Sequence, residues 1–405
     1  MRIAYVLSAF PSTSETFILH QIVGAVQADH QVDIHAYKVS GHVKHPALAA
    51  NQLLNHVYYR PTVPTTIWLR LLKTSSLMLA LLLLDTRRCF GLLGLWKATR
   101  FSEWLELFFL AWPLRGGKKY DVIHAHFGSN GLMAVRLRQA GFLQGNIVTS
   151  FHGFDANVVP NMLGKDYYRV LFEHGDAFVV SSKFIGHKLS QLACPKHKIR
   201  RIPVGIDVND WSFQQRSGWQ GDAPMVLSVG RLTEVKGFTY AVTAMAKVRH
   251  VFADVQYQIV GDGDLKESLL AQAKALHLDD CIHFLGKNNQ AELDTLYQQS
   301  DLFIMPSIRA HDGAEEGQGM VLFEAQASGL AVIATDTGGI IESLPVGSSL
   351  ISEKDSDALA AKIITQLQTL KTQGYDGHHG RDFVKENFDI DKLNQQTLLF
   401  YRELI

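Results

Sequence analysis

The sequence predicts an α/β protein made of two doubly wound domains of similar size. The chain has 405 residues, which is too long for one small module and fits two or three domains. Short, nearly continuous apolar runs alternate with longer helical patterns, which is typical of parallel sheets covered by helices on both faces. The alternation is interrupted once, at residues 201–207, where a polar, glycine-containing stretch follows. We therefore expect a domain boundary at that point.

Ten apolar runs of strand length give the order of the expected strands. Five precede the interruption: Ile3–Leu7, Val32–Tyr37, Val122–His126, Ile147–Phe151 and Ala177–Ser181. Five follow it: Val226–Val229, Gln256–Val260, Ile282–Leu285, Leu302–Met305 and Ala331–Ala334. In open sheets of this kind, ligands bind beyond the carboxyl ends of the strands, so a cleft between the two domains is the expected site.

The domain limits follow from these runs. We predict an N-terminal domain at residues 1–206, a linker at 207–224 and a C-terminal domain at 225–385. Residues 386–405 have a helical pattern and could pack back on the first domain.

Composition and charge exclude several classes of protein. The 39 Lys and Arg residues balance 39 Asp and Glu residues, and only 19% of the chain is charged against 47% hydrophobic. This excludes a disordered chain and gives no overall positive field for nucleic acid. The three cysteines are far apart, so neither a disulfide framework nor a cysteine-based zinc site is predicted. The N-terminus lacks the apolar core of a signal peptide, and we expect a cytoplasmic protein.

Residues 67–119 depart from the α/β pattern. Their basic residues number nine against three acidic ones, and Leu-rich and Trp-rich stretches lie between them. The longest uninterrupted apolar run is eight residues, below the roughly 18 to 20 that span a bilayer, so no transmembrane helix is predicted. Basic residues beside Leu- and Trp-rich helices favour docking on an anionic membrane surface. The alternative is a helical insertion packed on the first domain, with Arg87 and Arg88 in solvent.

A glycine-containing loop followed by a helix is predicted in the second domain. Gly317 and Gly319 indicate the loop, and residues 320–328 have a helical composition. Glu316 therefore lies in the loop, and Glu324 lies just inside the helix.

The start of this helix is a candidate anion site. The amides of Gly319, Met320 and Val321 would be unpaired at the positive end of the helix dipole, which favours a group such as a diphosphate. A carboxylate on each side suits a nucleotide sugar, because sugar and ribose hydroxyls can donate to Glu316 and Glu324. The alternative is that one Glu stabilises the helix dipole and the other is solvated.

Two cations follow the first strand of the second domain. The strand at residues 226–229 ends in Gly230 and Arg231, and a polar turn with Lys236 leads to a helix predicted from Phe238. Both cations then lie beyond a strand's carboxyl end. A guanidinium and an ammonium there could hold a diphosphate and offset the charge it gains as a leaving group. The alternative is that both are ordinary surface residues.

These motifs resemble the nucleotide-sugar half of the family 4 retaining glycosyltransferases over roughly residues 201–339. The residues that carry the resemblance are Gly230-Arg231-Leu232, Lys236-Gly237, Glu316-Gly317, Glu324-Ala325, Ser328-Gly329 and Thr335-Asp336-Thr337-Gly338-Gly339. The resemblance implies the GT-B fold, in which two doubly wound, Rossmann-like domains face each other across a cleft.

The resemblance also implies roles for the second domain. Arg231 and Lys236 would bind the diphosphate, Glu316 would contact the donor sugar and Glu324 the ribose. The family is assigned retention of anomeric configuration by front-side attack, in which the leaving phosphate helps to deprotonate the acceptor. No cofactor or metal ion is then expected, because the two cations and the start of the helix would stabilise the negative charge of the leaving diphosphate.

The first domain adds further candidates by resemblance. Residues 10–17 resemble the opening of exopolysaccharide glycosyltransferases of the colanic-acid type, and residues 121–128 and 150–155 resemble strand ends that face the cleft. By family analogy, His152 touches the donor sugar near the reacting carbon. The acceptor-side candidates are Glu15, Thr16, His126 and Asp155.

The implied function is transfer of a hexose from a nucleotide diphosphate sugar, expected to be a UDP-sugar. The acceptor would be a lipid-linked oligosaccharide or a polysaccharide, in exopolysaccharide or lipopolysaccharide biosynthesis. The enzyme would be peripheral on the inner face of the cytoplasmic membrane. A glycoside hydrolase that uses Glu316 and Glu324 as its two carboxylates is a different possibility. A non-catalytic scaffold of the same fold that binds glycan or lipid is another.

Three smaller patterns bear on metal, dinucleotide and sugar binding. His124 and His126, two apart on a strand, could share a metal ion, although no cysteine or carboxylate cluster completes a site. The segment from Gly261 to Gly263 could indicate a dinucleotide loop, but residue 266 is Lys, so a turn is favoured. Gln318 stands where the family more often has an apolar residue or proline, which could alter the choice of sugar.

Overall fold

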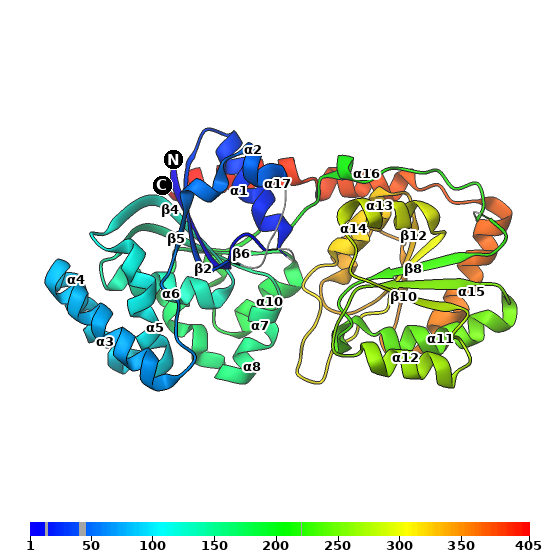
Figure 1. Ribbon diagram of the computed structural model, residues 1–405. Helices are drawn as coiled ribbons and strands as arrows, with labels where there is room; N and C mark the ends of the chain where they lie inside the picture. The colour runs from blue at the N-terminus through cyan, green and yellow to red at the C-terminus, as the bar shows by residue number, and fades with distance from the viewer. Residues whose placement is uncertain (13–14, 40–45, 220) are drawn as a thin grey trace. The chain divides into compact units, whose positions relative to one another are not determined.

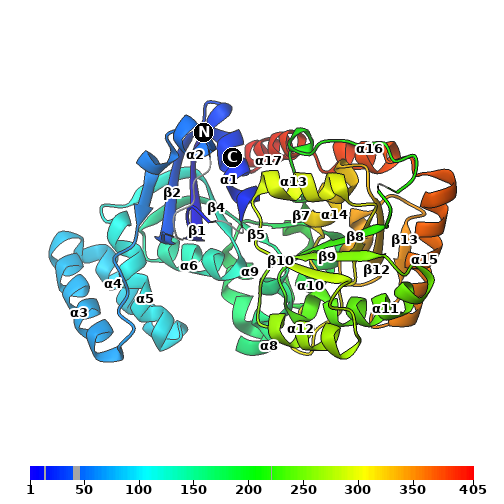
Figure 2. The same ribbon diagram turned by 45° about the vertical axis from the view of Figure 1, so that its right-hand side comes forward.

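The computed structural model describes residues 1–12, 15–39, 46–219 and 221–405, and divides into two compact units (Figures 1 and 2). The first unit contains residues 1–181, 186–202 and 394–405, and the second contains 182–185 and 203–393. Each unit is built on one parallel sheet, which confirms the predicted class of two doubly wound α/β domains.

The first sheet has seven strands in the order β3-β2-β1-β4-β5-β6-β7. Its strands are β1 (Arg2–Ala9), β2 (Gln31–Lys38), β3 (Val57–Tyr59), β4 (Lys118–His126), β5 (Leu143–Phe151), β6 (Ala177–Val180) and β7 (Ile199–Arg201). The chain order reverses between β1 and β4, and this is the switch point where open α/β sheets bind ligands.

The second sheet has six strands in the order β10-β9-β8-β11-β12-β13, with its switch point between β8 and β11. Its strands are β8 (Met225–Val229), β9 (Gln256–Val260), β10 (Ile282–Gly286), β11 (Leu302–Met305), β12 (Ala331–Thr335) and β13 (Ser349–Ile351). Both sheets contain the predicted strands together with short strands that the apolar pattern does not predict: β3, β7 and β13.

Helices cover both faces of each sheet (Figure 1). Those at the start of the chain and in the insertion are α1 (Thr16–Gln27), α2 (Pro46–Ala50), α3 (Ile67–Leu84), α4 (Thr86–Gly94) and α5 (Phe101–Ala111). The helices that follow β4, β5 and β6 are α6 (Gly128–Gln139), α7 (Phe154–Asn157), α8 (Val159–Leu163), α9 (Arg169–His174) and α10 (Lys183–Gln191). The later helices are α11 (Phe238–Val251), α12 (Lys266–Ala275), α13 (Gln290–Gln299), α14 (Met320–Ala327), α15 (Ser356–Gln373), α16 (His378–Asn387) and α17 (Ile390–Leu404).

Central strands are apolar throughout because both of their faces are covered. In β11, Leu302 and Ile304 belong to one apolar cluster, and Phe303 and Met305 belong to another. Successive side chains of a strand point to opposite faces, so the two clusters lie on the two sides of the sheet. The carboxyl ends of the strands are left as the place for polar side chains.

The segment 207–224, predicted as a linker, belongs to the second unit. Arg216 anchors it: the side chain is buried, and its guanidinium donates to the carbonyls of Ser300 at 3.0 Å and Tyr297 at 2.8 Å. In the contact pattern of the structure, the two units meet along the chain at residues 202–203.

The last residues of the chain, 394–405, belong to the first unit. The Asn146 side chain on β5 donates to the carbonyl of Leu404 at 2.8 Å, and the ring of His124 on β4 is hydrogen-bonded to the hydroxyl of Tyr401. The C-terminal helix α17 is thereby tied to two strands of the first sheet.

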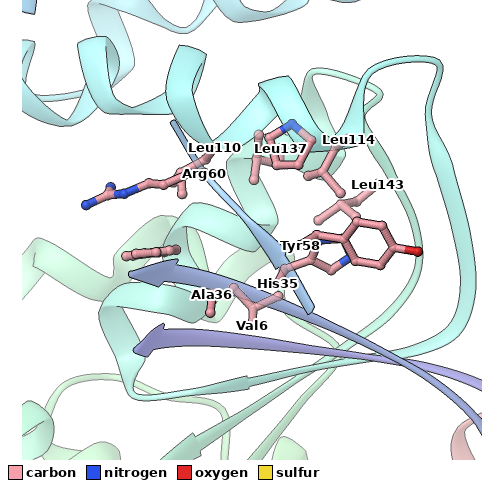
Figure 3. Close-up of a pocket in the computed structure, with 11 residues that line it drawn as sticks. Val6, His35, Ala36, Tyr58, Arg60, Leu110, Leu114, Leu137 and Leu143 are labelled. Atoms are coloured by element: carbon pink, nitrogen blue, oxygen red, sulfur yellow. The ribbon is translucent and has the colours of Figure 1, made fainter. Parts of the chain in front are cut away.

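Residues 67–114 form a helical layer on the outside of the first unit. Helix α5 packs on α6, and α3 packs on α4 and α5. The inner side of this layer meets β2 and β3, where Leu110 and Leu114 lie over His35 around a cavity of about 20 Å³ (Figure 3). The cavity has room for about one water molecule, so it is a packing gap and not a substrate pocket.

Helix α3 differs from the sequence prediction. It has 18 residues with a mean hydropathy of 1.7, so by length and composition it could cross a membrane, yet only 17% of it is buried. The prediction considered only uninterrupted apolar runs. Arg70 and Lys73 interrupt the apolar run, but the mean hydropathy of the helix stays high enough for a membrane-spanning segment.

Candidate active site

The candidate site residues of the second unit follow the two strands at its switch point. Gly230 follows β8, and the loop that contains Glu316 follows β11. Because neighbouring parallel strands end at the same edge, groups far apart in the sequence meet there.

The segment after β8 is held by the turn after β9. The Gly230 amide donates to the carbonyl of Val260 at 2.9 Å, and the Leu232 amide donates to that of Asp262 at 3.0 Å. Gly261 has φ +139°, and a Cβ there would lie 1.9 Å from the Gly230 carbonyl oxygen. Residues 261–263 are therefore a close-packed turn.

Lys236 and Glu316 form an ion pair. The Lys236 Nζ lies 2.7 Å from the Glu316 Oε1, and both side chains are mostly buried, with 16% and 12% exposed. The lysine stem runs past Gly230, where a Cβ would approach its Cδ and Cε to 3.3 Å. The structure thus brings together three of the predicted donor-site residues.

The Glu316 loop is fixed by the two glycines after β12. The Gly339 amide donates to the Glu316 carbonyl at 2.8 Å. Gly338 has φ +59°, and a Cβ there would lie 2.2 Å from the same carbonyl oxygen. Any larger residue at 338 would displace Glu316 from Lys236, which explains why this loop needs the glycine pair.

Helix α14 begins at Met320 as predicted, and Gly319 provides no side-chain cap. The Gly319 amide donates to the Ser343 hydroxyl at 3.3 Å. The amides of Met320 and Val321 have no acceptor in the described part of the chain. Two of the three predicted cradle amides therefore remain for an anion.

Glu324 sits on the first turns of α14 and accepts a hydrogen bond from the Tyr297 hydroxyl at 2.8 Å. Burial raises the pKa of Glu324 to about 7, although the Tyr297 hydroxyl and the Lys236 ammonium act in the opposite direction. This carboxyl therefore titrates near neutral pH, which is typical of groups in functional sites.

Arg231 and Gln318 differ in their surroundings. Arg231 is exposed, and its guanidinium has no hydrogen-bond or ion-pair partner among the described residues. Gln318 is engaged at both ends of its amide: it accepts from the Val204 amide at 3.1 Å and donates to the Val204 carbonyl at 2.8 Å. Gln318 anchors the backbone near the domain boundary, so its side chain is not free to select a sugar.

The first unit has a histidine cluster at the ends of β4 and β5. The His126 Nδ1 lies 3.0 Å from the His152 Nε2, with the rings parallel and 5.2 Å apart. His124 also stacks on His126, with the ring centroids 4.4 Å apart. Burial lowers the pKa of His124 and of His152 to about 3 and that of His126 well below its usual value. The three rings are therefore neutral at neutral pH.

The burial of His126 indicates which nitrogen carries its hydrogen. A contact between two neutral imidazoles holds a single hydrogen. The His126 Nε2 is buried and has no partner among the described residues, and an unsatisfied N–H donor there would be more costly than a bare nitrogen. The hydrogen then lies on the His126 Nδ1 and is donated to the His152 Nε2. His152 is left with an N–H on its Nδ1.

Asp155 positions His152. The Asp155 Oδ1 accepts from the amides of His152 and Gly153, and its Oδ2 accepts from the Gly128 amide, all at 3.0 Å. Burial raises the pKa of Asp155 while these bonds oppose the rise. The carboxylate is 2% exposed, so it ties the His152 loop to the start of α6 and is not placed to touch an acceptor.

The remaining acceptor-side candidates lie at the start of α1. Thr16 is exposed on its first turn, and Glu15 occupies the preceding cap position without a side-chain cap bond. Burial raises the pKa of Glu15. Thr13 and Ser14 of the same motif lie outside the described residues.

Sequence reasoning missed the groups that hold the site residues. The Tyr297 hydroxyl donates to Glu324, and the Ser343 hydroxyl accepts from the Gly319 amide. The Tyr401 hydroxyl is hydrogen-bonded to His124. They lie 27, 24 and 277 residues from their partners. No local spacing signal connects such pairs, since the fold alone brings them together.

The described residues contain no group of three or more His, Cys, Asp or Glu side chains placed to hold a metal ion. His124, one of the two alternative ligands, is engaged by Tyr401 on one nitrogen and by the Ser150 hydroxyl at 2.7 Å on the other. His124 is therefore a hydrogen-bonded core residue.

Two doubly wound units with a cation–carboxylate pair at the switch point of the second are typical of the two-domain glycosyltransferases. The family model described as Glycosyltransferase Family 4 matches residues 14–210, and the one described as Glycosyl transferases group 1 matches residues 209–373. The chain belongs to the family 4 glycosyltransferases and has the GT-B fold.

Curated relatives match over nearly the full chain. The putative colanic acid biosynthesis glycosyltransferase WcaL of Salmonella typhimurium is 31% identical, with 98% of each chain covered. The amylovoran biosynthesis glycosyltransferase AmsK of Erwinia amylovora is 30% identical, with 91% of each covered.

Solved structures share the fold. HepE from Anabaena, solved with UDP-glucose, superposes with a TM-score of 0.70 at 17% identity, covering all of both chains. Sucrose-phosphate synthase from Thermosynechococcus elongatus has a TM-score of 0.71 at 19% identity, covering 100% of this chain and 99% of its own.

Proposed function

We propose that this chain transfers a hexose from a nucleotide diphosphate sugar, with UDP as the nucleotide, to a growing exopolysaccharide or lipopolysaccharide. The observation that carries the proposal is the Lys236–Glu316 pair beside the uncapped start of α14. A cation, a carboxylate and two free amides at one switch point match the charges and hydroxyls of a sugar diphosphate.

In the proposed complex, the diphosphate replaces Glu316 as the partner of Lys236. Arg231 is exposed and can add a planar fork of donors, while the Met320 and Val321 amides complete the anion site. Glu316, once released, accepts from hydroxyls of the donor sugar, and Glu324 accepts from the ribose. These groups offset the negative charge of the departing diphosphate, so the proposed reaction needs no metal ion.

His152 is proposed to act as a donor of a hydrogen bond to the sugar. Its ring is neutral, and its Nδ1 carries the hydrogen, so it can stabilise a hydroxyl or an oxygen that gains negative charge. It does not act as a general base at neutral pH, because its Nε2 is engaged by His126. The acceptor hydroxyl then loses its proton to the leaving phosphate, with retention of configuration.

The acceptor and the location are proposed from the relatives. Two of them are named for colanic acid and amylovoran biosynthesis, and HepE binds UDP-glucose in its solved structure. A lipid-linked oligosaccharide is therefore the proposed acceptor. The proposed place of work is the inner face of the cytoplasmic membrane, where such acceptors lie.

A thermal-shift screen of UDP-, GDP- and ADP-sugars tests the donor, because a ligand that binds the native state raises the melting temperature. A shift with UDP-hexoses that disappears in Lys236→Ala supports the proposal. Sugar release from a glycan without any nucleotide would identify a hydrolase instead. With the donor known, NMR of the product decides between retention and inversion.

A further inference from the structure

The outward side of α3 is an exposed apolar surface. Trp68, Leu72, Leu79 and Leu83 follow spacings of four, seven and four residues, so they share one face of the helix. They are 73%, 69%, 59% and 78% exposed. We call these four residues the α3 outer face. Leu77 and Leu81, on the opposite side, are buried, so the helix already uses its other face for packing.

Exposed aromatic residues extend this surface beyond α3. Phe90 on α4, Trp96 and Phe101 are each more than half exposed. Both views of the fold place α3 and α4 at the periphery of the first unit (Figures 1 and 2). An apolar surface this large on a folded unit marks an interaction site.

The charges around this surface are positive. Each of the three acidic residues in 67–119 is neutralised by an arginine: Asp85 by Arg88, Glu103 by Arg136 and Glu106 by Arg60. Arg87 and Lys97 are exposed and form no ion pair with any described residue. Part of the predicted local excess of positive charge, at Arg87 and Lys97, therefore faces solvent.

The sheet topology decides how such a helix could meet a bilayer. The strand before α3, β3, pairs with β2, and the strand after the insertion, β4, pairs with β1 in the same sheet. A single crossing by α3 would place β3 and β4 on opposite sides of the membrane. A second crossing would be needed to return, and among the described residues only α3 is long and apolar enough.

We propose that the α3 outer face, with the adjoining surface of α4, docks on an anionic phospholipid bilayer, with α3 in the plane of the interface. Trp68 and the leucines would enter the boundary between headgroups and acyl chains, while Arg87 and Lys97 contact the phosphates. The docking itself does not depend on the proposed function. Only its purpose, which is to hold the enzyme beside a lipid-linked acceptor, rests on that function.

Vesicle flotation with the full chain tests the surface. We expect binding to vesicles of phosphatidylglycerol and phosphatidylethanolamine, and weak binding to phosphatidylcholine. Leu79→Gln with Leu83→Gln should weaken the binding by at least about tenfold, since two leucines that would be buried in the bilayer on docking are lost. The matched control, Leu270→Gln with Leu276→Gln, changes two exposed leucines of the second unit and should bind as wild type. Equal binding by both pairs would overturn the proposal.

A second pair of variants tests the contribution of the basic residues to vesicle binding. Arg87→Gln with Lys97→Gln should weaken binding to anionic vesicles on the order of tenfold at low salt. Lys274→Gln with Lys385→Gln, at exposed positions of the second unit, should have no effect. High salt should reduce wild-type binding towards the level of the charge variant. Salt-independent binding would contradict the assignment to anionic lipid.

Further measurements separate the remaining candidate occupants. Extraction at alkaline pH should release the protein, and retention would indicate a spanning helix. Sedimentation without lipid should give the same mass for wild type and for Leu79→Gln with Leu83→Gln. A wild-type dimer that dissociates in this variant would assign the surface to a second copy. Calorimetry with UDP should give the same affinity for all variants, so loss of UDP binding would count against the proposed function and not against docking.

Discussion

The two units place chemically different groups at the same position of the same fold. At the switch point of the second sheet, Lys236 and Glu316 are charged and paired, and Glu324 titrates near neutrality. At the strand ends of the first sheet, His126 and His152 are stacked and neutral, with His126 buried and His152 half-buried. A doubly wound sheet thus supplies a location but not a chemistry, and the side chains after each strand give one unit a charged pair and the other neutral rings.

Removal of the charge partner should have the largest effect. Lys236→Ala should lower transfer on the order of a hundred- to a thousandfold, because it removes a group that stabilises the leaving diphosphate and leaves Glu316 partly buried without a cation. Steady-state kinetics with the identified donor and calorimetry with UDP measure this. Lys247→Ala, which removes an exposed ion pair, is the control. Equal activity in the two variants would remove Lys236 from the site.

The histidine cluster should affect transfer without affecting the nucleotide. His152→Ala should lower transfer on the order of a hundredfold, while the affinity for free UDP stays unchanged. His126→Phe should lower transfer less, because His152 loses only the partner that orients its ring. Weaker UDP binding in His152→Ala would contradict the division between the two units.

The two carboxylates of the second unit should differ from each other. Glu324→Ala should weaken free UDP about tenfold, because a charged acceptor for the ribose is lost. Glu316→Ala should retain the affinity for UDP but lower transfer. Titration calorimetry with UDP decides this, and equal losses of UDP affinity would show that the roles are not divided.

The pH dependence of stability should have opposite signs in the two units. The raised pKa of Glu324 stabilises the fold below about pH 4.5, and this contribution, on the order of 3 kcal/mol, is lost as the pH rises through 7. The lowered pKa values of His124 and His152 act in reverse: their contribution is present above pH 6.5 and is lost as the pH falls towards 3.

Glu324→Gln tests the contribution of Glu324 separately from that of the histidines. The variant should be more stable than wild type at pH 8, and the difference should vanish below pH 4.5, as measured by urea unfolding. Glu386→Gln changes an exposed carboxylate of the same unit and is the control. A stability difference for Glu324→Gln that does not change with pH would show that the pKa of Glu324 is not raised in the folded protein.

The smallest effect is expected for the residue that supports Glu324. Tyr297→Phe removes one hydrogen bond to the carboxylate, so UDP affinity should fall a few-fold at pH 7 and recover at higher pH. Unchanged affinity across pH would show that the Tyr297 hydroxyl does not tune Glu324.

Much of the fold could be predicted because its signals are local. The ten apolar runs are the buried strands, and α11 and α14 begin at Phe238 and Met320, where the glycine-containing turns end. The edge strands β3, β7 and β13 were missed, since three partly exposed residues carry no apolar run. The contacts of 207–224 could not be predicted, because this polar segment is fixed to the second unit by one buried arginine, Arg216, whose partners are distant carbonyls.

The sequence by itself determined the two α/β domains, the cations after β8 and the carboxylates around α14, because strand period, glycine and charge are properties of short segments. Only the tertiary structure decided that Lys236 pairs with Glu316, that Asp155 serves the His152 loop, and that α3 keeps an apolar face outside. Those outcomes depend on which strand ends are neighbours and on how much of each helix other elements cover. In a parallel sheet, neighbouring strands and the helices that cover them come from residues far apart in the chain, so no short segment carries this information.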